Sequence, residues 1–217
     1  MASQIIYGRQ PVAEAERGRR RVHRVWRAPE TDAYELERLC GSADHQGVVA
    51  EVDPYPYGDA KALLRREDAL IVALDQVQDP RNLGAVCRSA EVAGAAGLIV
   101  PERRAAAITA SACKASAGAV EHLEIAHVRN LSDWLAAAKE AGFWIWGADA
   151  DADAAPWSVD LGGPTVLVLG GEGKGLRPRV AASCDGLLAL PQRGRIDSLN
   201  VSAAATALLF EALRQRS

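Results

Sequence analysis

The chain has 217 residues, of which 49% are hydrophobic and 24% are charged, and its formal net charge is −3. This composition is ordinary for a globular protein with a sizeable core, built as one large domain or as one small and one medium domain. No apolar run reaches the roughly 18–20 residues of a membrane-spanning helix, and the first residues lack the layout of a signal peptide, so we expect a cytoplasmic protein without a membrane span.

The first 27 residues are strongly basic, in contrast to the chain as a whole. They contain seven arginines and two glutamates, a local net charge of +5. A basic cluster can contact nucleic-acid phosphates whatever the global charge, and the alternative is a solvated surface. From this pattern we predict RNA contacts by Arg9, Arg19, Arg20 and Arg21.

The sequence up to residue 57 predicts a small α/β unit. We expect helices over residues 11–20 and 33–40, and strands over residues 21–27 and 47–52. The segment DPYPYGD, residues 53–59, is rich in residues that break regular structure. We therefore predict a first domain over residues 1–57, a linker over 58–68 and a second domain over 69–217.

From residue 69 onward, short continuous apolar runs alternate with helical patterns. Runs of this kind are typical of strands buried on both faces of a parallel sheet, so we predict an open α/β sheet. The expected strands are 69–74, 97–100, 143–146, 165–170 and 186–190, and the expected helices are 83–93, 108–117, 131–141 and 199–214.

The cysteines carry no metal-binding pattern. No Cys-x-x-Cys pair occurs, and no histidine stands beside a cysteine at zinc-ligand spacing. We expect reduced, mostly buried thiols at Cys40, Cys87, Cys113 and Cys184, and no metal site.

Three polar loops follow predicted strands, where ligands bind in open α/β sheets. The first is DQVQDPRNLGAVCR, residues 75–88. Asn82 is placed to cap the helix that follows, and Arg88 comes about 1.7 helical turns later. Taken alone, this loop also fits a capped helix with a surface arginine.

The second loop is LGGEGKGLR, residues 169–177, with glycines at 170, 171, 173 and 175 around Glu172. Glycines let the backbone approach a ligand closely and offer its amide groups. The spacing does not match G-x-x-x-x-G-K-[ST], because Val168 stands where the first glycine is required and no Ser or Thr follows Lys174. The loop also does not follow the first strand, as a dinucleotide fingerprint does.

The third loop is LPQRGRIDSLNVS, residues 190–202, which leads into the last helix. Ser198 and Asn200 stand at the helix entry, where such residues often act as caps. The loop also carries Arg193, Arg195 and Asp197, a dense polar set.

Together, the three loops resemble the signature motifs of the SpoU (TrmH-like) branch of the SPOUT RNA methyltransferases. The first resembles DPxNxGxxxR, the second GxExxG and the third SLNxS, in the same order and spacing across residues 70–217. The start of the chain, IIYGRQPVAEA, and HQGVVAEV at 45–52 resemble the substrate-binding domain of the 23S rRNA guanosine-2′-O subgroup. The segment between Trp26 and His45 is shorter than usual in that domain.

The resemblance implies a homodimer with an α/β catalytic domain that ends in a deep trefoil knot, preceded by a small α/β domain similar to a ribosomal protein. It implies that S-adenosylmethionine binds at Gly170, Gly171, Gly175, Leu190 and Leu199. The catalytic residues that it implies are Asn82, Arg88, Glu172, Ser198 and Asn200.

The implied reaction moves a methyl group to a ribose 2′-hydroxyl without a metal. Arg88 is then either the proton acceptor or the group that grips a phosphate and stabilises the developing alkoxide, since arginine normally keeps its proton. The expected substrate is a guanosine of 23S rRNA, with tRNA or an antibiotic-resistance site in rRNA as alternatives. Two other classes remain: a non-catalytic RNA-binding or ribosome-assembly protein, and a nucleotide-dependent oxidoreductase, against which the absent early glycine fingerprint argues.

Overall fold

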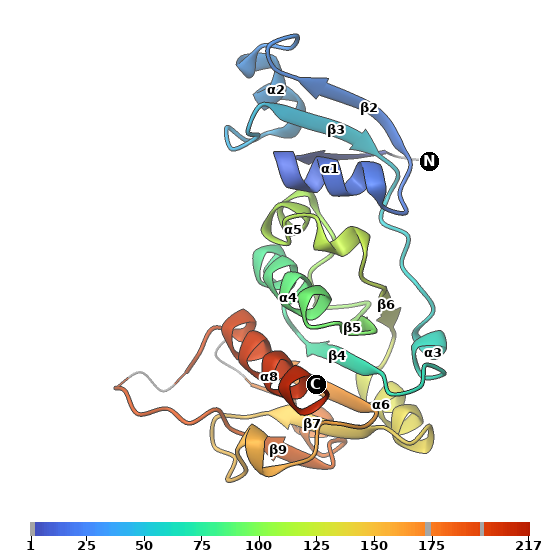
Figure 1. Ribbon diagram of the computed structural model, residues 1–217, viewed down its shortest axis with the longest axis vertical. Coiled ribbons are helices and arrows are strands. Elements are labelled where there is room, and N and C mark those ends of the chain that lie inside the picture. Colours follow the sequence, from blue (N-terminus) through green and yellow to red (C-terminus); the bar gives the residue numbers. More distant parts are fainter. Residues whose placement is uncertain (1–2, 172–174, 196–197) are drawn as a thin grey trace. The chain divides into compact units, whose positions relative to one another are not determined.

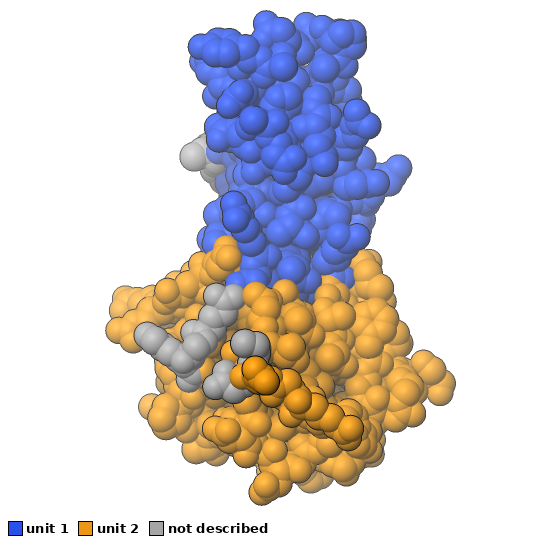
Figure 2. Space-filling model, turned by 90° about the vertical axis from the view of Figure 1, so that its left-hand side faces the viewer, with its two compact units in different colours: residues 1–56, 80–88, 107–122 blue, residues 57–79, 89–106, 123–217 orange. Residues whose placement is uncertain are grey.

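A computed structural model describes residues 3–171, 175–195 and 198–217. The chain divides into two compact units, shown in Figure 2. Unit 1 consists of residues 1–56, 80–88 and 107–122, and unit 2 of residues 57–79, 89–106 and 123–217. The predicted domains, 1–57 for RNA binding and 69–217 for catalysis with a linker over 58–68, are defined by function. They therefore stay a prediction.

Unit 1 is built on an antiparallel sheet with the strand order β1-β3-β2, visible in Figure 1. In chain order its elements are β1 (Gln4–Tyr7), α1 (Arg9–Arg17), β2 (Val22–Arg27), α2 (Ala33–Cys40), β3 (Val48–Val52), the first part of α4 (Pro80–Val92), α5 (Ala110–Ala115) and the short 3₁₀ helix η1 (Ala119–Glu121).

Helix α2 has the bounds that the sequence predicts, and both of its ends have a local cause. The carboxylate of Asp32 accepts a hydrogen bond from the Glu35 backbone N–H at 2.8 Å, which satisfies a free amide of the first turn. Gly41 ends the helix in the left-handed conformation, with φ 70°, which costs glycine little.

Two segments of unit 1, residues 80–88 and 107–122, follow the first and second strands of the parallel sheet in sequence. Helix α5 contacts β1, and η1 contacts α1. Gly84, in the first part of α4, lies so close to α5 that a Cβ atom there would come within 2.4 Å of the Ala112 carbonyl oxygen. Only glycine permits this approach, so the α4 segment of unit 1 is packed tightly on α5.

A buried ion pair joins the N-terminal segment of unit 1 to η1. The side chains of Arg20 and Glu121 are 0% and 1% exposed, and the Arg20 Nε donates to Glu121 Oε2 at 3.0 Å. A second guanidinium nitrogen donates to the other carboxylate oxygen, and a third donates to Gln4 Oε1 at 2.9 Å. A buried carboxylate needs such a partner, so the prediction that Arg20 contacts RNA is wrong.

Unit 2 contains a six-stranded parallel sheet with the order β6-β5-β4-β8-β7-β9. Its elements are α3 (Ala60–Leu63), β4 (Leu70–Asp75), the end of α4, β5 (Gly97–Pro101), β6 (Ile125–Val128), α6 (Leu131–Glu140), β7 (Trp144–Ala148), η2 (Pro156–Ser158), β8 (Thr165–Gly170), α7 (Pro178–Ala181), β9 (Gly186–Leu188) and α8 (Val201–Gln215).

Helices cover both faces of the sheet of unit 2. On one face, α3, α6 and α7 pack over alternate strand residues such as Ile71 and Val168. On the other face, α8 (Figure 1) lies along β8. Leu169 of β8 and Leu208 of α8 line the same cavity. Burial on both faces explains why the strands are continuous apolar runs in the sequence.

The strands and helices that the sequence predicts are present, with ends displaced by a few residues. In the described part of the chain, six elements were not predicted: β1, β6, α3, α7, η1 and η2. The cap assignment of Asn82 is wrong, because α4 begins at Pro80 and Asn82 lies inside its first turn. The predicted trefoil knot concerns the path of residues 171–200, part of which lies outside the described residues, and it stays a prediction.

The four cysteines are free thiols, as expected, and Cys87 and Cys113 are buried. Burial raises the pKa of the Cys113 thiol to about 11, so it packs as a small neutral side chain. Within the described ranges, no helix is long and apolar enough to cross a membrane. In the same residues, no three His, Cys, Asp or Glu side chains gather as they would around a metal ion.

We predict that Arg20→Met lowers the free energy of unfolding by about 3–5 kcal/mol, because it leaves Glu121 charged and buried without a partner. Urea unfolding measures this loss. The double variant Arg20→Met/Glu121→Leu should recover most of it, and Arg38→Met, whose exposed pair with Glu35 is worth little, serves as the control. Equal stability of Arg20→Met and Arg38→Met would contradict this account.

Candidate active site

A cavity of about 360 Å³ opens in unit 2 at the carboxyl ends of β7, β8 and β9. Ligands of open parallel sheets bind at this edge. Its lining residues come from the ends of these strands, the segment after β9 and the start of α8: Ala148, Asp149, Ala150, Leu169, Gly170, Gly171, Gly175, Leu188, Leu190, Gln192, Ser198, Leu199, Val201, Ala204 and Leu208.

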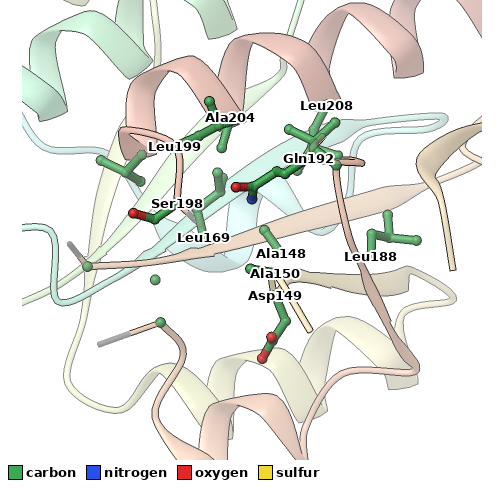
Figure 3. Close-up of a pocket in the computed structure, with 15 residues that line it drawn as sticks. Ala148, Asp149, Ala150, Leu169, Leu188, Gln192, Ser198, Leu199, Ala204 and Leu208 are labelled. Carbon is green, nitrogen blue, oxygen red and sulfur yellow. The ribbon is translucent and has the colours of Figure 1, made fainter. Parts of the chain in front are cut away.

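The cavity has an apolar body with a few polar groups around it. Figure 3 shows Gln192, Ser198 and Leu199 on the side of α8, and Ala148, Asp149 and Ala150 on the opposite side, at the end of β7. Four leucines, Leu169, Leu188, Leu190 and Leu208, also line the cavity. This mixture of apolar walls and sparse polar groups is typical of a small-molecule site.

The floor of the cavity is made of closely packed backbone. A Cβ atom on Gly170 would lie 2.2 Å from the Gly175 carbonyl carbon, and one on Gly171 would lie 2.5 Å from the Gln76 carbonyl oxygen. Gly171 and Gly175 also form an isolated β-bridge, and Gly175 has φ +59°. Glycine is therefore required at 170 and 171 by the contacts of the backbone itself.

A buried carboxylate holds the segment that follows these glycines. Asp75, fully buried at the end of β4, pairs in register with Gly170. It accepts hydrogen bonds from the Arg177 backbone N–H at 2.9 Å and from Arg177 Nε at 2.7 Å. One aspartate thus fixes both the main chain and the side chain of Arg177.

The entry of α8 forms a third wall. Asn200 is the N-cap: its side-chain oxygen accepts hydrogen bonds from the Ser202 backbone N–H at 2.8 Å and from Ser202 Oγ at 2.6 Å. The capping role that the sequence indicates for Asn200 is confirmed. The cap sets the direction of the chain, so that Ser198, Leu199 and Val201 all reach the cavity.

The structure brings most of the predicted cofactor and catalytic residues of unit 2 to this one cavity. Gly170, Gly171, Gly175, Leu190 and Leu199 line it, together with Ser198. Asn82 and Arg88 lie on α4 within unit 1, where Asn82 is half-buried and Arg88 is exposed. Glu172 lies outside the described residues. The binding and catalytic roles of these residues remain predictions.

Three polar residues of this region were not predicted as site residues. Asp149 and Gln192 line the cavity, and Asp75 anchors Arg177 beside it. Asp75 and Asp149 each come directly at or after a strand end, and this position in the sequence was the available signal. Gln192 stands in the third polar loop, two residues after Leu190.

The remaining arginines predicted to contact RNA are on the surface of unit 1. Arg9, Arg19 and Arg21 are exposed. The Arg9 Nε donates to the Gln46 carbonyl oxygen at 3.2 Å, and an Arg19 guanidinium nitrogen donates to the Tyr55 hydroxyl at 3.2 Å. Their contact with RNA remains a prediction that exposure permits.

Comparisons with known proteins agree on one family. The model of the SpoU rRNA methylase family matches residues 69–210, and the model of the RNA 2′-O ribose methyltransferase substrate-binding domain matches residues 30–58. An uncharacterized tRNA/rRNA methyltransferase, slr0955 of Synechocystis, is 37% identical over 99% of this chain and 63% of its own length. The 23S rRNA (guanosine-2′-O-)-methyltransferase RlmB of Pseudomonas aeruginosa is 44% identical over 80% of this chain and 72% of its own length.

Among solved structures, the chain is similar to the SpoU methyltransferase AviRb from Streptomyces viridochromogenes in complex with the cofactor AdoMet. The TM-score is 0.83 at 30% sequence identity, covering 99% of this chain and 90% of AviRb. The chain spans less than two thirds of the length of the Synechocystis relative.

We predict that Asp75→Asn lowers the free energy of unfolding by about 3 kcal/mol, because a neutral amide cannot replace a buried carboxylate that binds both the Arg177 amide and its guanidinium. Hydrogen exchange should also show faster exchange of the Arg177 amide. The control is Arg179→Ala, which removes an exposed pair with Asp133 and should cost at most about 1 kcal/mol. Wild-type protection of that amide in Asp75→Asn would overturn the assignment.

Proposed function

The chain belongs to the SpoU rRNA methylase family, and we propose that it transfers a methyl group from S-adenosylmethionine to a ribose 2′-hydroxyl of structured RNA. The observation that carries this proposal is the cavity at the carboxyl ends of β7, β8 and β9. Its lining includes the residues that the family resemblance assigns to cofactor binding, Gly170, Gly171, Gly175, Leu190 and Leu199.

The cavity suits S-adenosylmethionine in size and in chemistry. Its volume of about 360 Å³ lies in the range typical of small-molecule sites. Leu169, Leu188 and Leu208 offer apolar surface for the adenine ring, and the backbone groups of Gly170 and Gly171 can approach a ligand closely. Asp149 can accept hydrogen bonds from ribose hydroxyl or amino groups. We propose Gly170, Gly171, Gly175, Leu190 and Leu199 as the cofactor-binding residues.

When bound, the cofactor supplies a methyl group on a positively charged sulfonium, so the transfer needs no metal. The protein has to orient a ribose hydroxyl and stabilise the negative charge that develops as the hydroxyl loses its proton. We propose that Arg88 stabilises this developing charge, either by contacting the ribose oxygen or by contacting the neighbouring phosphate. Asn82, Glu172, Ser198 and Asn200 would orient Arg88, the ribose and the cofactor loops.

For the substrate we propose a guanosine of 23S rRNA, in line with the activity in the name of the Pseudomonas relative. The name of the Synechocystis relative includes tRNA, which makes a tRNA ribose the second candidate. Unit 1 would dock folded RNA through phosphate contacts of Arg9, Arg19 and Arg21, because a ribose target does not require reading of base edges.

We also propose a homodimer located in the cytoplasm. Phe210, on α8, is 45% exposed, and such an apolar side chain on a helix surface suits a subunit contact. The cytoplasmic location follows from the RNA substrate proposed.

We predict that Ala204→Trp weakens binding of S-adenosylhomocysteine, the cofactor product, by more than about tenfold, because the indole would fill the cavity that Ala204 lines. Isothermal titration calorimetry measures this without RNA. Ala203→Trp is the matched control, since Ala203 is exposed on the same helix. The cofactor site is misassigned if both variants bind as tightly as wild type.

For Arg88→Ala we expect a loss of methyl transfer of about 10²–10³-fold, because the developing alkoxide loses its stabilising charge. Affinity for S-adenosylhomocysteine should stay unchanged. Single-turnover transfer to ribosomal RNA measures the loss, and Arg88→Lys, which keeps the charge, should retain part of the rate. An Arg88→Ala protein with the wild-type rate would refute the role of Arg88.

A further inference from the structure

A group of exposed arginines lies at the carboxyl edge of the sheet of unit 2, away from the cavity. Arg103 and Arg104 follow β5, and Arg129 follows β6. Pro101 pairs in register with Val128, so the two loops begin side by side at the end of neighbouring strands (Figure 1). We call these three arginines the β5–β6 corner.

Among the described residues, the arginines of the β5–β6 corner have no acidic partner. Surface arginines such as Arg38 and Arg214 pair with a glutamate three residues away. Within the described residues, no carboxylate lies within 4.0 Å of the guanidinium groups of the β5–β6 corner. The three positively charged guanidinium groups therefore face the solvent without a carboxylate paired to them.

The loop that carries two of these arginines is tied down at both ends. The Glu102 backbone N–H donates to the Val128 carbonyl at 2.9 Å, and the Ala106 backbone N–H donates to the Val77 carbonyl at 2.8 Å. Arg104 has φ 58°, a left-handed conformation that is uncommon outside glycine and fixes a tight turn. The arginines are thus presented on a short, anchored loop, which limits the entropy lost when they bind.

An aromatic pair lies at the end of β6, where His127 comes two residues before Arg129. The rings of Tyr57 and His127 stack with their centroids 3.8 Å apart, and Tyr57 is 37% exposed. Burial lowers the pKa of His127, and the charge of Glu102 opposes this shift. Glu102 is the one acid in the loop, and the corner keeps a positive balance. Basic side chains together with exposed aromatic rings are typical of RNA-contacting surfaces.

We propose that Arg103, Arg104 and Arg129 bind phosphodiester groups of the substrate RNA, next to the nucleotide that is methylated. The proposal rests on the RNA-methylating function proposed above. The β5–β6 corner lies on the same edge of the sheet as the cavity, with β6 three strands from β8. At about 4.8 Å per strand this is roughly 14 Å, a span that one RNA segment covers. Guanidinium groups are well suited to phosphate, and the contact carries no sequence information.

The test compares two triple variants with the same change in charge. One is Arg103→Gln/Arg104→Gln/Arg129→Gln. The control is Arg65→Gln/Arg179→Gln/Arg214→Gln, which removes three exposed, acid-paired arginines from the same unit. The probe is total ribosomal RNA, because phosphate contacts do not depend on the target nucleotide. The affinity is measured over a range of KCl concentrations, and S-adenosylhomocysteine binding checks that the cavity is intact.

We expect the plot of log affinity against log salt to become shallower by about 2 in the corner variant, from three lost contacts of about 0.7 each, and to stay at the wild-type slope in the control. Equal slopes and affinities of corner variant, control and wild type would overturn the proposal and leave a solvated surface only. Wild-type protein that binds RNA without methylating it would contradict the proposed function but not the phosphate contacts. Wild-type protein that binds no RNA would overturn both.

Discussion

The close approach of backbone at the end of β8 is the constraint on which the site depends. Gly170 and Gly171 leave no room for a side chain, because Gly175 on one side and Gln76 on the other occupy the space of a Cβ atom. Asp75 then holds Arg177, and the segment that follows is fixed to the sheet. The cavity remains open because backbone atoms of these closely packed segments, rather than side chains, form its floor.

Which arginines of this protein contribute positive charge to its surface depends on which of them the fold buries. In the run Arg19–Arg20–Arg21, the middle residue turns inward to neutralise Glu121, while its neighbours stay exposed. One run of like residues thus serves both folding and surface charge. Exposed arginines also occur at the β5–β6 corner of unit 2. A protein with net charge −3 can in this way present positive charge where RNA is expected to bind.

The sequence indicated the parallel sheet and the site well, because both depend on local patterns. Apolar runs marked β4, β5, β7, β8 and β9, while β6 was missed because IAHV is short and contains a histidine. Motif spacing selected the glycines, Ser198 and Leu199 that meet at one cavity. The partner of Arg20 could not be predicted, since Glu121 is 101 residues away and only the fold brings it near. The membership of residues 80–88 and 107–122 in unit 1 is likewise a long-range property.

The most direct test of the account is transfer of a radioactive methyl group from S-adenosylmethionine to ribosomal RNA by the purified protein, followed by alkaline hydrolysis. A 2′-O-methylated ribose protects the adjacent phosphodiester bond, so the account predicts label in alkali-resistant dinucleotides, lost in the Ala204→Trp variant and retained in Ala203→Trp. Label in alkali-sensitive mononucleotides would place the methyl group on a base. That result, or no transfer by a protein that binds both cofactor and RNA, would contradict the account.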